Sequence, residues 1–250
     1  MLTTHDRLDW IIPSTHPVLR KGEVHVWQCS LEVSSSCFSE LRTALSPTEA
    51  ARAHSYHEQE ERGRFTISRA LLKKILAGYL NVDPYEVQFA YSDDGKPELS
   101  SSNSWLRFSK SSTHHVALFA VARDCDVGID VERIGVDCGV ESIADCVFTP
   151  EERFVLKSSP AAAKQEHFFS CWTRKEAIAK ALGCGLSIPW QQFPVFLRPR
   201  VPAQSLGARN TDMAVQEWSL IDLPMTDEYT GALAVRMTAP IISFWDATAL

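Results

Sequence analysis

The sequence predicts an α+β fold, of α/β character, made of two similar tandem halves related by a pseudo-twofold axis. The first observation is a helix-start pattern that occurs twice, as SPTE at Ser46–Glu49 and as TPEE at Thr149–Glu152. Each copy has a hydroxyl residue at the N-cap, proline at the first helical position and glutamate at the third, which is a capping box. The copies start 149 − 46 = 103 residues apart. We expect the active site in the cleft between the halves.

The second observation is that the same offset, or one close to it, aligns further elements in the same order. At this offset, VHVW (Val24–Trp27) aligns with VGID (Val127–Asp130) and Phe65 aligns with Phe168. Further along, the strand VALFAVA (Val116–Ala122) resembles TGALAVR (Thr230–Arg236). Each half is therefore predicted to run from a strand to a capped helix, a longer amphipathic helix and further strands. We expect the domains to be residues 1–122 and 123–250.

The composition indicates a globular protein and argues against several functional classes. The formal net charge is −6, which does not favour a nucleic-acid surface. The N-terminus lacks the pattern of a signal peptide, and no stretch approaches the roughly 20 apolar residues of a membrane span. The seven cysteines are odd in number and include no C-x-x-C, which argues against a disulfide framework and a thiolate zinc site. A reducing cytoplasm is expected.

The stretch DVGIDVERI contains the first candidate site. Val127, Ile129 and Val131 alternate with Gly128, Asp130 and Glu132, which is typical of a strand and places both acids on one face. Their Cα atoms are then roughly 6–7 Å apart, so both carboxylates can reach one hard cation. Oxygen ligands favour Mg²⁺ or Mn²⁺ over zinc. The alternative, a half-exposed strand whose polar residues face water, is equally compatible with this stretch alone.

The stretch WTRKEAIAK contains the second candidate site. It lies in a predicted helix, in which Glu176 and Lys180 are one turn apart. An exposed Glu–Lys pair is the ordinary interpretation. At the shared offset, however, Lys73 takes the place of Glu176 in the first half, and Trp27 and Cys29 take those of Asp130 and Glu132. The carboxylates therefore occur only in the second half, which predicts a single acidic centre.

Cations of the first half are candidates for binding a charged ligand. The GKP turn at Gly95–Pro97 holds Lys96 at its corner. Arg52 and Arg64 lie on the two predicted helices, as do Arg69, Lys73 and Lys74. Several of these can simply form a solvated face. Together with acids and a metal ion in the second half, they would suit a magnesium-bound pyrophosphate.

These residues carry a resemblance to a known family. The strand motif VGIDVE followed by WTRKEAIAK resembles the signature of the surfactin-type 4′-phosphopantetheinyl transferases. The SPTE helix start, the R-F-x-x-x-R pattern from Arg64 and the GKP turn agree with the same family. The resemblance covers about residues 23–236 and also implies duplicated halves with the site between them.

The resemblance implies a role for each matching residue. Asp130, Glu132 and Glu176 would bind Mg²⁺, or Mn²⁺, together with the pyrophosphate of coenzyme A. Lys180 would lie against the phosphates, and Asp130, Glu176 and Lys180 would be the catalytic residues. The residues implied in nucleotide and phosphate binding are Arg52, Arg64, Lys96, Pro97 and Lys175.

One segment departs from the family pattern. The family has F-N-[LI]-S-H-[ST] before the acidic strand, with its histidine on a nucleotide phosphate, whereas this chain has FSKSST. Ser112 therefore stands at the histidine position, which puts coenzyme A affinity in doubt. Ser111 and Ser112 can still donate hydrogen bonds, and Lys110 or His114 can supply charge. Alternation along a strand would point Lys110 to the same side as Ser112, so Lys110 is the better candidate.

The implied reaction is transfer of 4′-phosphopantetheine from coenzyme A to a serine of an apo acyl, polyketide or peptidyl carrier protein, releasing adenosine 3′,5′-bisphosphate. Either Glu176 or a metal-bound water would take the serine proton. The alternatives are a non-catalytic relative that binds coenzyme A or a carrier, and another Mg²⁺-dependent phosphotransferase, although no G-x-x-x-x-G-K-[ST] loop occurs. We expect a monomer, with carrier docking at the segment from Ile134 to Phe148, because it follows the acidic strand and its apolar residues are expected to be exposed.

Overall fold

The chain forms two compact units. The computed structural model describes residues 10–99, 101–135, 139–183, 189–195, 218–248 and 250. The first unit holds Ile11–Asp124 and Ile241–Leu250, and the second holds Cys125–Pro240 together with Trp10. The C-terminal segment therefore belongs with the first unit, which differs from the domain boundary expected from the sequence.

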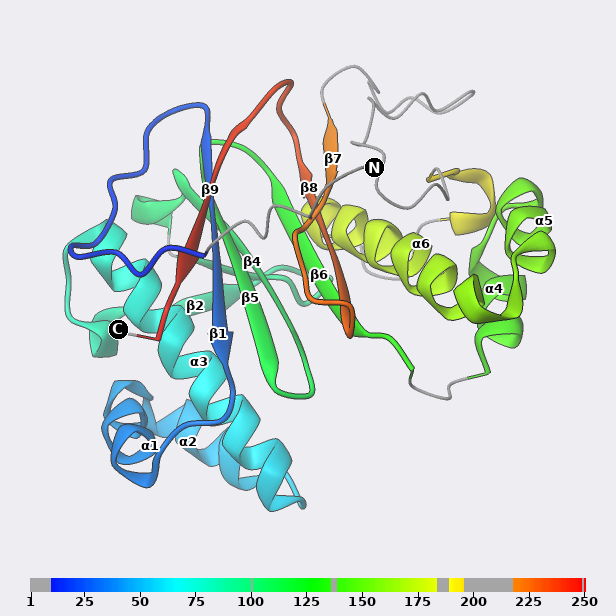
Figure 1. Cartoon of the computed structure of the whole chain (residues 1–250). Coiled ribbons are helices and arrows are strands. Elements are labelled where there is room, and N and C mark those ends of the chain that lie inside the picture. The colour runs from blue at the N-terminus through cyan, green and yellow to red at the C-terminus, as the bar shows by residue number, and fades with distance from the viewer. Residues whose placement is uncertain (1–9, 100, 136–138, 184–188, 196–217, 249) are drawn as a thin grey trace, which may run out of the picture. The chain divides into compact units, whose positions relative to one another are not determined.

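The first unit packs helices against a four-stranded sheet (Figure 1). Its strands are β1 (Glu23–Ser30), β2 (Phe89–Tyr91), β3 (Pro97–Leu99), β4 (Leu106–Thr113), β5 (Val116–Arg123) and β9 (Ile241–Asp246). Its helices are α1 (Ser35–Leu41), α2 (Pro47–His54) and α3 (Gln59–Leu80), with short 3₁₀ turns η1 (Arg42–Ala44), η2 (Pro84–Glu86) and η3 (Ser101–Asn103). The sheet order is β4-β5-β1-β9, and β2 and β3 form a separate hairpin. Buried leucine and isoleucine side chains of α3 pack with Trp27 and Phe119 from the sheet.

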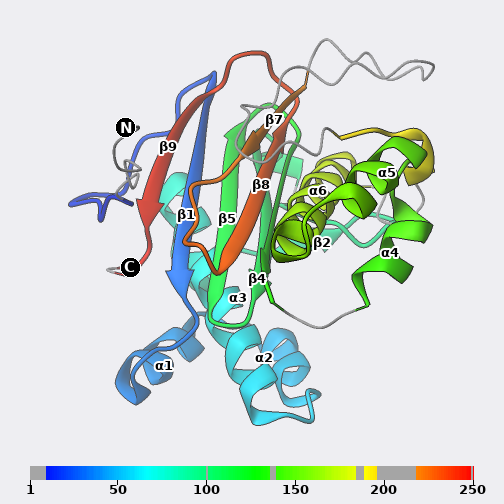
Figure 2. The ribbon, with the colours of Figure 1, turned by 45° about the vertical axis from the view of Figure 1, so that its right-hand side comes forward.

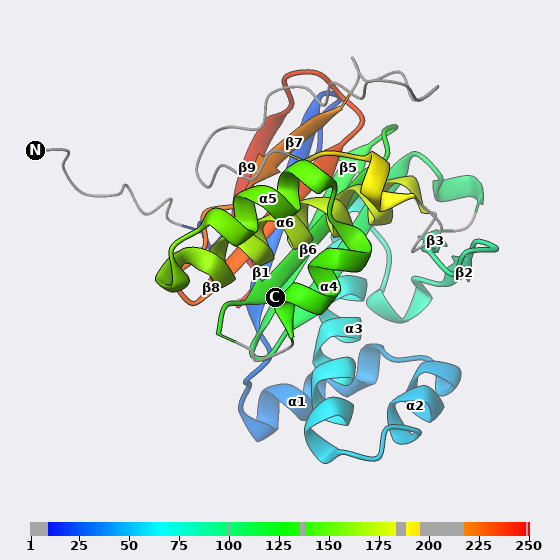
Figure 3. The same cartoon turned by 90° about the vertical axis from the view of Figure 1, so that its right-hand side faces the viewer.

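The second unit is built around one long helix. Its strands are β6 (Val127–Arg133), β7 (Ser219–Asp222) and β8 (Tyr229–Val235). Its helices are α4 (Val140–Val147), α5 (Pro150–Ser158) and α6 (Ala161–Leu182), with the 3₁₀ turn η5 (Trp190–Gln192). The sheet order is β6-β8-β7, and α6 lies along β6 and β8 (Figure 2). Helices α4 and α5 contact α6 on its other side (Figure 3).

The two units repeat one sheet plan. In each, the first strand pairs antiparallel with a later strand, which pairs antiparallel with a third: β1 with β5 and β4, and β6 with β8 and β7. Both predicted capping boxes are present, with Ser46 and Thr149 as N-caps and Glu49 and Glu152 at the third position. Strand β9 is an addition, because it extends the first sheet by pairing parallel with β1.

A buried lysine ties each capping box to the long helix of its unit. In the first unit, Lys73 Nζ lies 3.2 Å from Glu49 Oε2. In the second, Lys175 Nζ lies 3.0 Å from Glu152 Oε2, and both lysines are 1% exposed. Each ammonium also lies 5.6 Å from the centroid of an aromatic ring, Tyr85 or Trp190, and donates to that residue's backbone oxygen.

This shared arrangement changes the alignment of the two long helices. Because Lys73 and Lys175 make the same contacts, the offset between the helices is 175 − 73 = 102. The counterpart of Glu176 is then Lys74, and the sequence-based assignment to Lys73 was wrong by one position. A shift of one residue along a helix turns the side chain by about 100° around the helix axis. The residue aligned with Glu176 is therefore the partly exposed Lys74, not the buried Lys73.

Close packing between β6 and α6 requires the glycine of the acidic strand. A Cβ atom on Gly128 would overlap the backbone oxygen of Ala177 and the backbone nitrogen of Ala181. Both obstacles are backbone atoms of α6, which cannot rotate away as a side chain can. Gly128 therefore sets how near the helix comes to the strand.

Replacing Gly128 with alanine is expected to lower the free energy of unfolding by about 3 kcal/mol, because the strand and the helix must separate to admit the methyl group. Urea denaturation followed by circular dichroism measures the change. Gly63 in α3 is a matched control with no atom near its Cβ position. Gly63→Ala is expected to stabilise by up to about 1 kcal/mol through helix propensity. An unchanged unfolding midpoint for Gly128→Ala would contradict the packing argument.

None of the described helices has the length and apolar character needed to cross a membrane. The cysteines within the described residues form no disulfide, and Cys29 and Cys171 are buried.

Candidate functional site

The acidic centre of the second unit lies where β6 meets α6. Asp130 is 2% exposed, and its Oδ1 accepts a hydrogen bond from Lys180 Nζ at 2.6 Å. Side chains alternate along a strand, so Asp130 and Glu132 share a face with Gly128. The contacts of Gly128 identify that face as the one against α6. The predicted strand face is therefore the face that meets the helix of Glu176 and Lys180.

Glu176 lies beside this ion pair, and its carboxyl pKa is raised. Burial is the largest cause, because it disfavours the charged form. The negative charge of Asp130 raises the pKa further, and the ammonium of Lys180 opposes this. A carboxyl group whose charged form is disfavoured by burial and by a neighbouring carboxylate is an environment in which a bound cation is stabilising.

The donor chemistry suits a hard divalent cation, but a complete ligand set is not preformed. Among the residues that the structure describes, no group of three or more histidine, cysteine, aspartate or glutamate side chains stands ready to hold a metal ion. Asp130 and Glu176 are close enough for their charges to interact, and Lys180 engages one oxygen of Asp130. Carboxylate oxygens are the ligands that Mg²⁺ and Mn²⁺ prefer. Metal binding would require Lys180 to share Asp130 with the cation.

A partly buried ion pair that the sequence did not reveal holds the same helix from another side. Arg174 Nε donates to Asp222 Oδ1 at 2.7 Å, and Nη2 donates to Oδ2 at 2.5 Å. Arg174 is 3% exposed, and Asp222 ends β7. Because Arg174 precedes Glu176 by two residues, or about 200° around the helix, this bidentate pair restrains the rotation that points Glu176 toward β6. No spacing rule links positions 174 and 222, so only the tertiary structure could identify the pair.

Lys175 does not fit the predicted role in coenzyme A binding. Its ammonium donates to the backbone oxygens of Trp190 and Phe193 at 3.0 and 2.6 Å and pairs with Glu152. Three acceptors use the three donors of a lysine, and the side chain is buried. The contacts assign Lys175 to holding α5, α6 and the segment after them together.

The first unit has a cavity that brings three predicted residues together. This β4 cavity has a volume of about 430 Å³, and Arg64, Lys110 and Ser112 line it. Lys110 and Ser112 face it from β4, as strand alternation predicts, whereas Ser111 is buried and is not part of its lining. Lys110 Nζ also donates to Ser68 Oγ at 3.2 Å. His114, the other residue that the sequence offered as a source of charge, also lines it. The remaining lining residues, which the sequence had not indicated, are Leu31, Tyr56, Glu61, Phe65, Ser68 and Thr113.

The other predicted nucleotide-binding residues lie outside the lining of the β4 cavity. Arg52 is on α2, with its guanidinium 5.5 Å from the centroid of the Phe65 ring. The GKP turn joins β2 to β3, with Gly95 at φ 81° and the Lys96 backbone nitrogen bonded to Ser92 Oγ at 3.1 Å. Pro97 opens β3. The predicted turn is confirmed, while a ligand contact for these residues stays a prediction.

The segment from Ile134 to Phe148 packs inward, which corrects the expectation of exposed apolar side chains there. Phe148 is fully buried. The side chains packed partly buried against the same core are Ile134, Val140, Ile143 and Val147. Residues 136–138 lie outside the described part of the chain. Exposed apolar side chains occur instead on α5, where Phe154 is 71% and Val155 43% exposed. The sequence-based expectation was wrong because the apolar stripe of the short helix α4 packs against α6 and does not face a partner.

The chain is similar to known proteins of one family. Residues 126–234, which include β6, α6 and β7, match the model of the 4′-phosphopantetheinyl transferase superfamily. The chain is 36% identical over 238 residues to the 4′-phosphopantetheinyl transferase HetI of Nostoc sp., covering 94% of this chain and 97% of HetI. It is 28% identical to the transferase gsp of Aneurinibacillus migulanus, over 65% of this chain and 66% of that protein. It is 23% identical to the transferase Sfp of Bacillus subtilis, over 61% and 66% of the two chains.

The match to HetI extends over nearly the whole of both chains, and the family match includes each residue of the acidic centre. The motif resemblance found in the sequence is therefore confirmed. The chain belongs to the 4′-phosphopantetheinyl transferase superfamily and is an enzyme of that kind.

Proposed function

We propose that this enzyme transfers the 4′-phosphopantetheine group of coenzyme A to a serine of an apo acyl, polyketide or peptidyl carrier protein, with Mg²⁺ as cofactor and adenosine 3′,5′-bisphosphate as the second product. The observation that carries the proposal is the Asp130–Lys180 ion pair with the carboxyl group of Glu176 beside it. An enzyme that handles a pyrophosphate needs carboxylates for a divalent cation and a lysine for the phosphate oxygens, and this centre offers both.

The three carboxylates Asp130, Glu132 and Glu176 would hold Mg²⁺. When bound, the cation would neutralise charge on the pyrophosphate oxygens. Lys180, which donates a hydrogen bond to Asp130, would donate another to a phosphate oxygen. The serine oxygen then forms a bond to the β-phosphorus, the bond from that phosphorus to the bridging oxygen breaks, and adenosine 3′,5′-bisphosphate leaves. Glu176 is proposed to accept the serine proton, because burial raises its affinity for a proton.

The first unit would bind the nucleotide end of coenzyme A. Arg64 and Lys110 supply positive charge to the β4 cavity, and Ser112 supplies a hydroxyl. The family resemblance implies further contacts with the nucleotide, and the proposal retains them for Arg52, Lys96, Pro97 and Ser111. A single chain would hold both sets of residues and would be a complete enzyme. A cytoplasmic site of action is consistent with the absence of disulfides among the described cysteines.

A direct assay tests the proposal. The protein is mixed with coenzyme A, Mg²⁺ and each of several apo carrier proteins, and the carriers are weighed by mass spectrometry. A mass gain equal to phosphopantetheine on the acceptor serine is expected. If none of the carriers gains mass, the transferase proposal fails. Coenzyme A binding without transfer would instead favour a non-catalytic relative, the alternative motivated by Ser112 at the usual histidine position.

Lys110→Ala is expected to weaken coenzyme A binding about tenfold or more, because a lysine bonded to a phosphate contributes about 1.5–3 kcal/mol. Isothermal titration calorimetry measures the change. Arg107 is a matched control on the same strand, because it pairs with Glu98 and is not part of the lining of the β4 cavity. Equal affinities for Lys110→Ala and the parent protein would remove Lys110 from the site.

A further inference from the structure

The first unit has a second cavity, on another face of α3. This α1 cavity has a volume of about 480 Å³ and shares no lining residue with the β4 cavity. Arg62 and Thr66 of α3 line it, whereas Glu61, Phe65 and Ser68 of the same helix line the β4 cavity. No part of the transfer reaction proposed above uses its residues.

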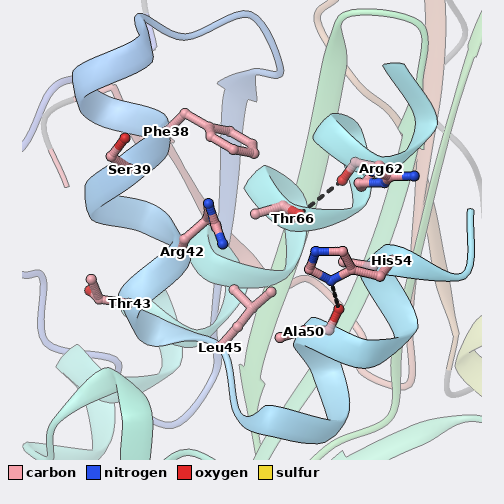
Figure 4. Close-up of a pocket in the computed structure, with 10 residues that line it drawn as sticks. Phe38, Ser39, Arg42, Thr43, Leu45, Ala50, His54, Arg62 and Thr66 are labelled. Carbon is pink, nitrogen blue, oxygen red and sulfur yellow. Dashed lines mark hydrogen bonds between the residues drawn. The ribbon is translucent and has the colours of Figure 1, made fainter. Parts of the chain in front are cut away.

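The wall of the α1 cavity combines apolar and cationic side chains. Phe38 and Leu45 form apolar surface (Figure 4). The buried Ala53 adds to it. Arg42, at the end of α1, and His54, at the end of α2, reach into the cavity from opposite sides (Figure 4). A cavity of this size that combines apolar surface with polar side chains is typical of sites for small molecules.

The charge of the α1 cavity is positive in a chain whose net charge is −6. Arg42, His54 and Arg62 line it, and no aspartate or glutamate does so among the residues that the structure describes. The Arg62 guanidinium is engaged, since Nη2 donates to the Tyr56 backbone oxygen at 3.0 Å. Arg42, in contrast, makes no side-chain hydrogen bond or ion pair with any other described residue. Its guanidinium has all its donors for a ligand.

His54 can add a second donor beside Arg42. Its Nδ1 donates to the backbone oxygen of Ala50 at 2.7 Å, because a carbonyl only accepts. Nε2 is therefore an acceptor in the neutral ring and a donor in the protonated ring. Arg42 carries a permanent positive charge that can pair with an anion. His54 adds a second positively charged donor when its ring is protonated.

We propose that the α1 cavity binds an amphiphilic anion. A carboxylate or phosphate head would lie between Arg42 and His54, and an alkyl or acyl chain would lie against Phe38, Leu45 and Ala53. A bare anion would leave the apolar wall in water, and a neutral chain would leave the Arg42 donors unused. Free carboxylates and phosphate-headed lipids share this chemistry, and the test separates them.

The test is calorimetric titration of the full chain with decanoate, decyl phosphate, decanol and inorganic phosphate. Decanoate or decyl phosphate is expected to bind at least tenfold more tightly than either decanol or inorganic phosphate, and the tighter of the two identifies the head group. Arg42→Gln is expected to lower that affinity about tenfold. Ala50→Phe, which fills the cavity from α2, is expected to abolish binding. Arg107→Gln, outside both cavities, should bind as the parent does.

Several results would overturn the inference. One is the absence of binding by both chain-bearing anions at about millimolar concentration. Others are a decanol affinity equal to that of decanoate, and undiminished binding by Arg42→Gln or Ala50→Phe variants whose circular dichroism shows a folded chain. Because the readout is binding of these probes, its failure says nothing about phosphopantetheine transfer, and the reverse also holds.

Discussion

Replacing Glu176 with glutamine is expected to lower phosphopantetheine transfer about a thousandfold, since it removes a charge placed for the transition state. The fold should survive the change. The raised pKa means that folding disfavours the ionised form of Glu176. A carboxyl group whose folded pKa exceeds its unfolded pKa costs stability as the pH rises through those values, so a neutral glutamine leaves stability unchanged or higher at pH 7.

Transfer rates come from the mass of the carrier protein over time, and Mn²⁺ affinity from calorimetry supplies a readout that does not depend on turnover. Both are expected to fall in Glu176→Gln. Glu166→Gln is the matched control, because it makes the same chemical change in the same helix away from Asp130. A Glu176→Gln enzyme with parent-like rates would take Glu176 out of the mechanism. Loss of rate with parent-like Mn²⁺ affinity would keep it as the base and remove it as a ligand.

Replacing Lys175 with methionine is expected to lower the free energy of unfolding by about 3–5 kcal/mol, because it leaves a buried carboxylate without its counter-charge. Glu152 is 4% exposed, and the ammonium of Lys175 lies 3.0 Å from its Oε2. Glu152 Oε1 accepts from the Val195 backbone nitrogen, so the glutamate cannot turn toward water without losing a second contact. Urea denaturation measures the change.

Two further variants test the cause. Lys164→Met is the control on the same helix, because Lys164 pairs with the largely exposed Glu141. Its expected cost is below about 1 kcal/mol, as for other surface ion pairs. The double variant Lys175→Met with Glu152→Gln is expected to be more stable than Lys175→Met alone, because no buried charge is then left unpaired. If the double variant is less stable than the single one, the buried charge is not the cause.

Local patterns in the sequence predicted the elements that depend on neighbours along the chain. The hydroxyl-Pro-x-Glu starts became capping boxes at Ser46 and Thr149, because a cap is satisfied within four residues. The alternation in VGIDVE became β6, and the turn at Gly95 has the positive φ expected of glycine. The helix of WTRKEAIAK also formed as predicted.

What the sequence by itself determined was therefore the kind of protein and the residue types of its acidic centre. Only the tertiary structure decided which neighbouring side chains serve the site and which serve the core. Lys175 and Glu176 are adjacent in sequence, yet one ammonium is buried among Glu152 and two carbonyls while the other side chain faces Asp130. The physical reason is that a helix turns each residue by about 100°, so packing partners far away in sequence decide which surroundings each side chain meets.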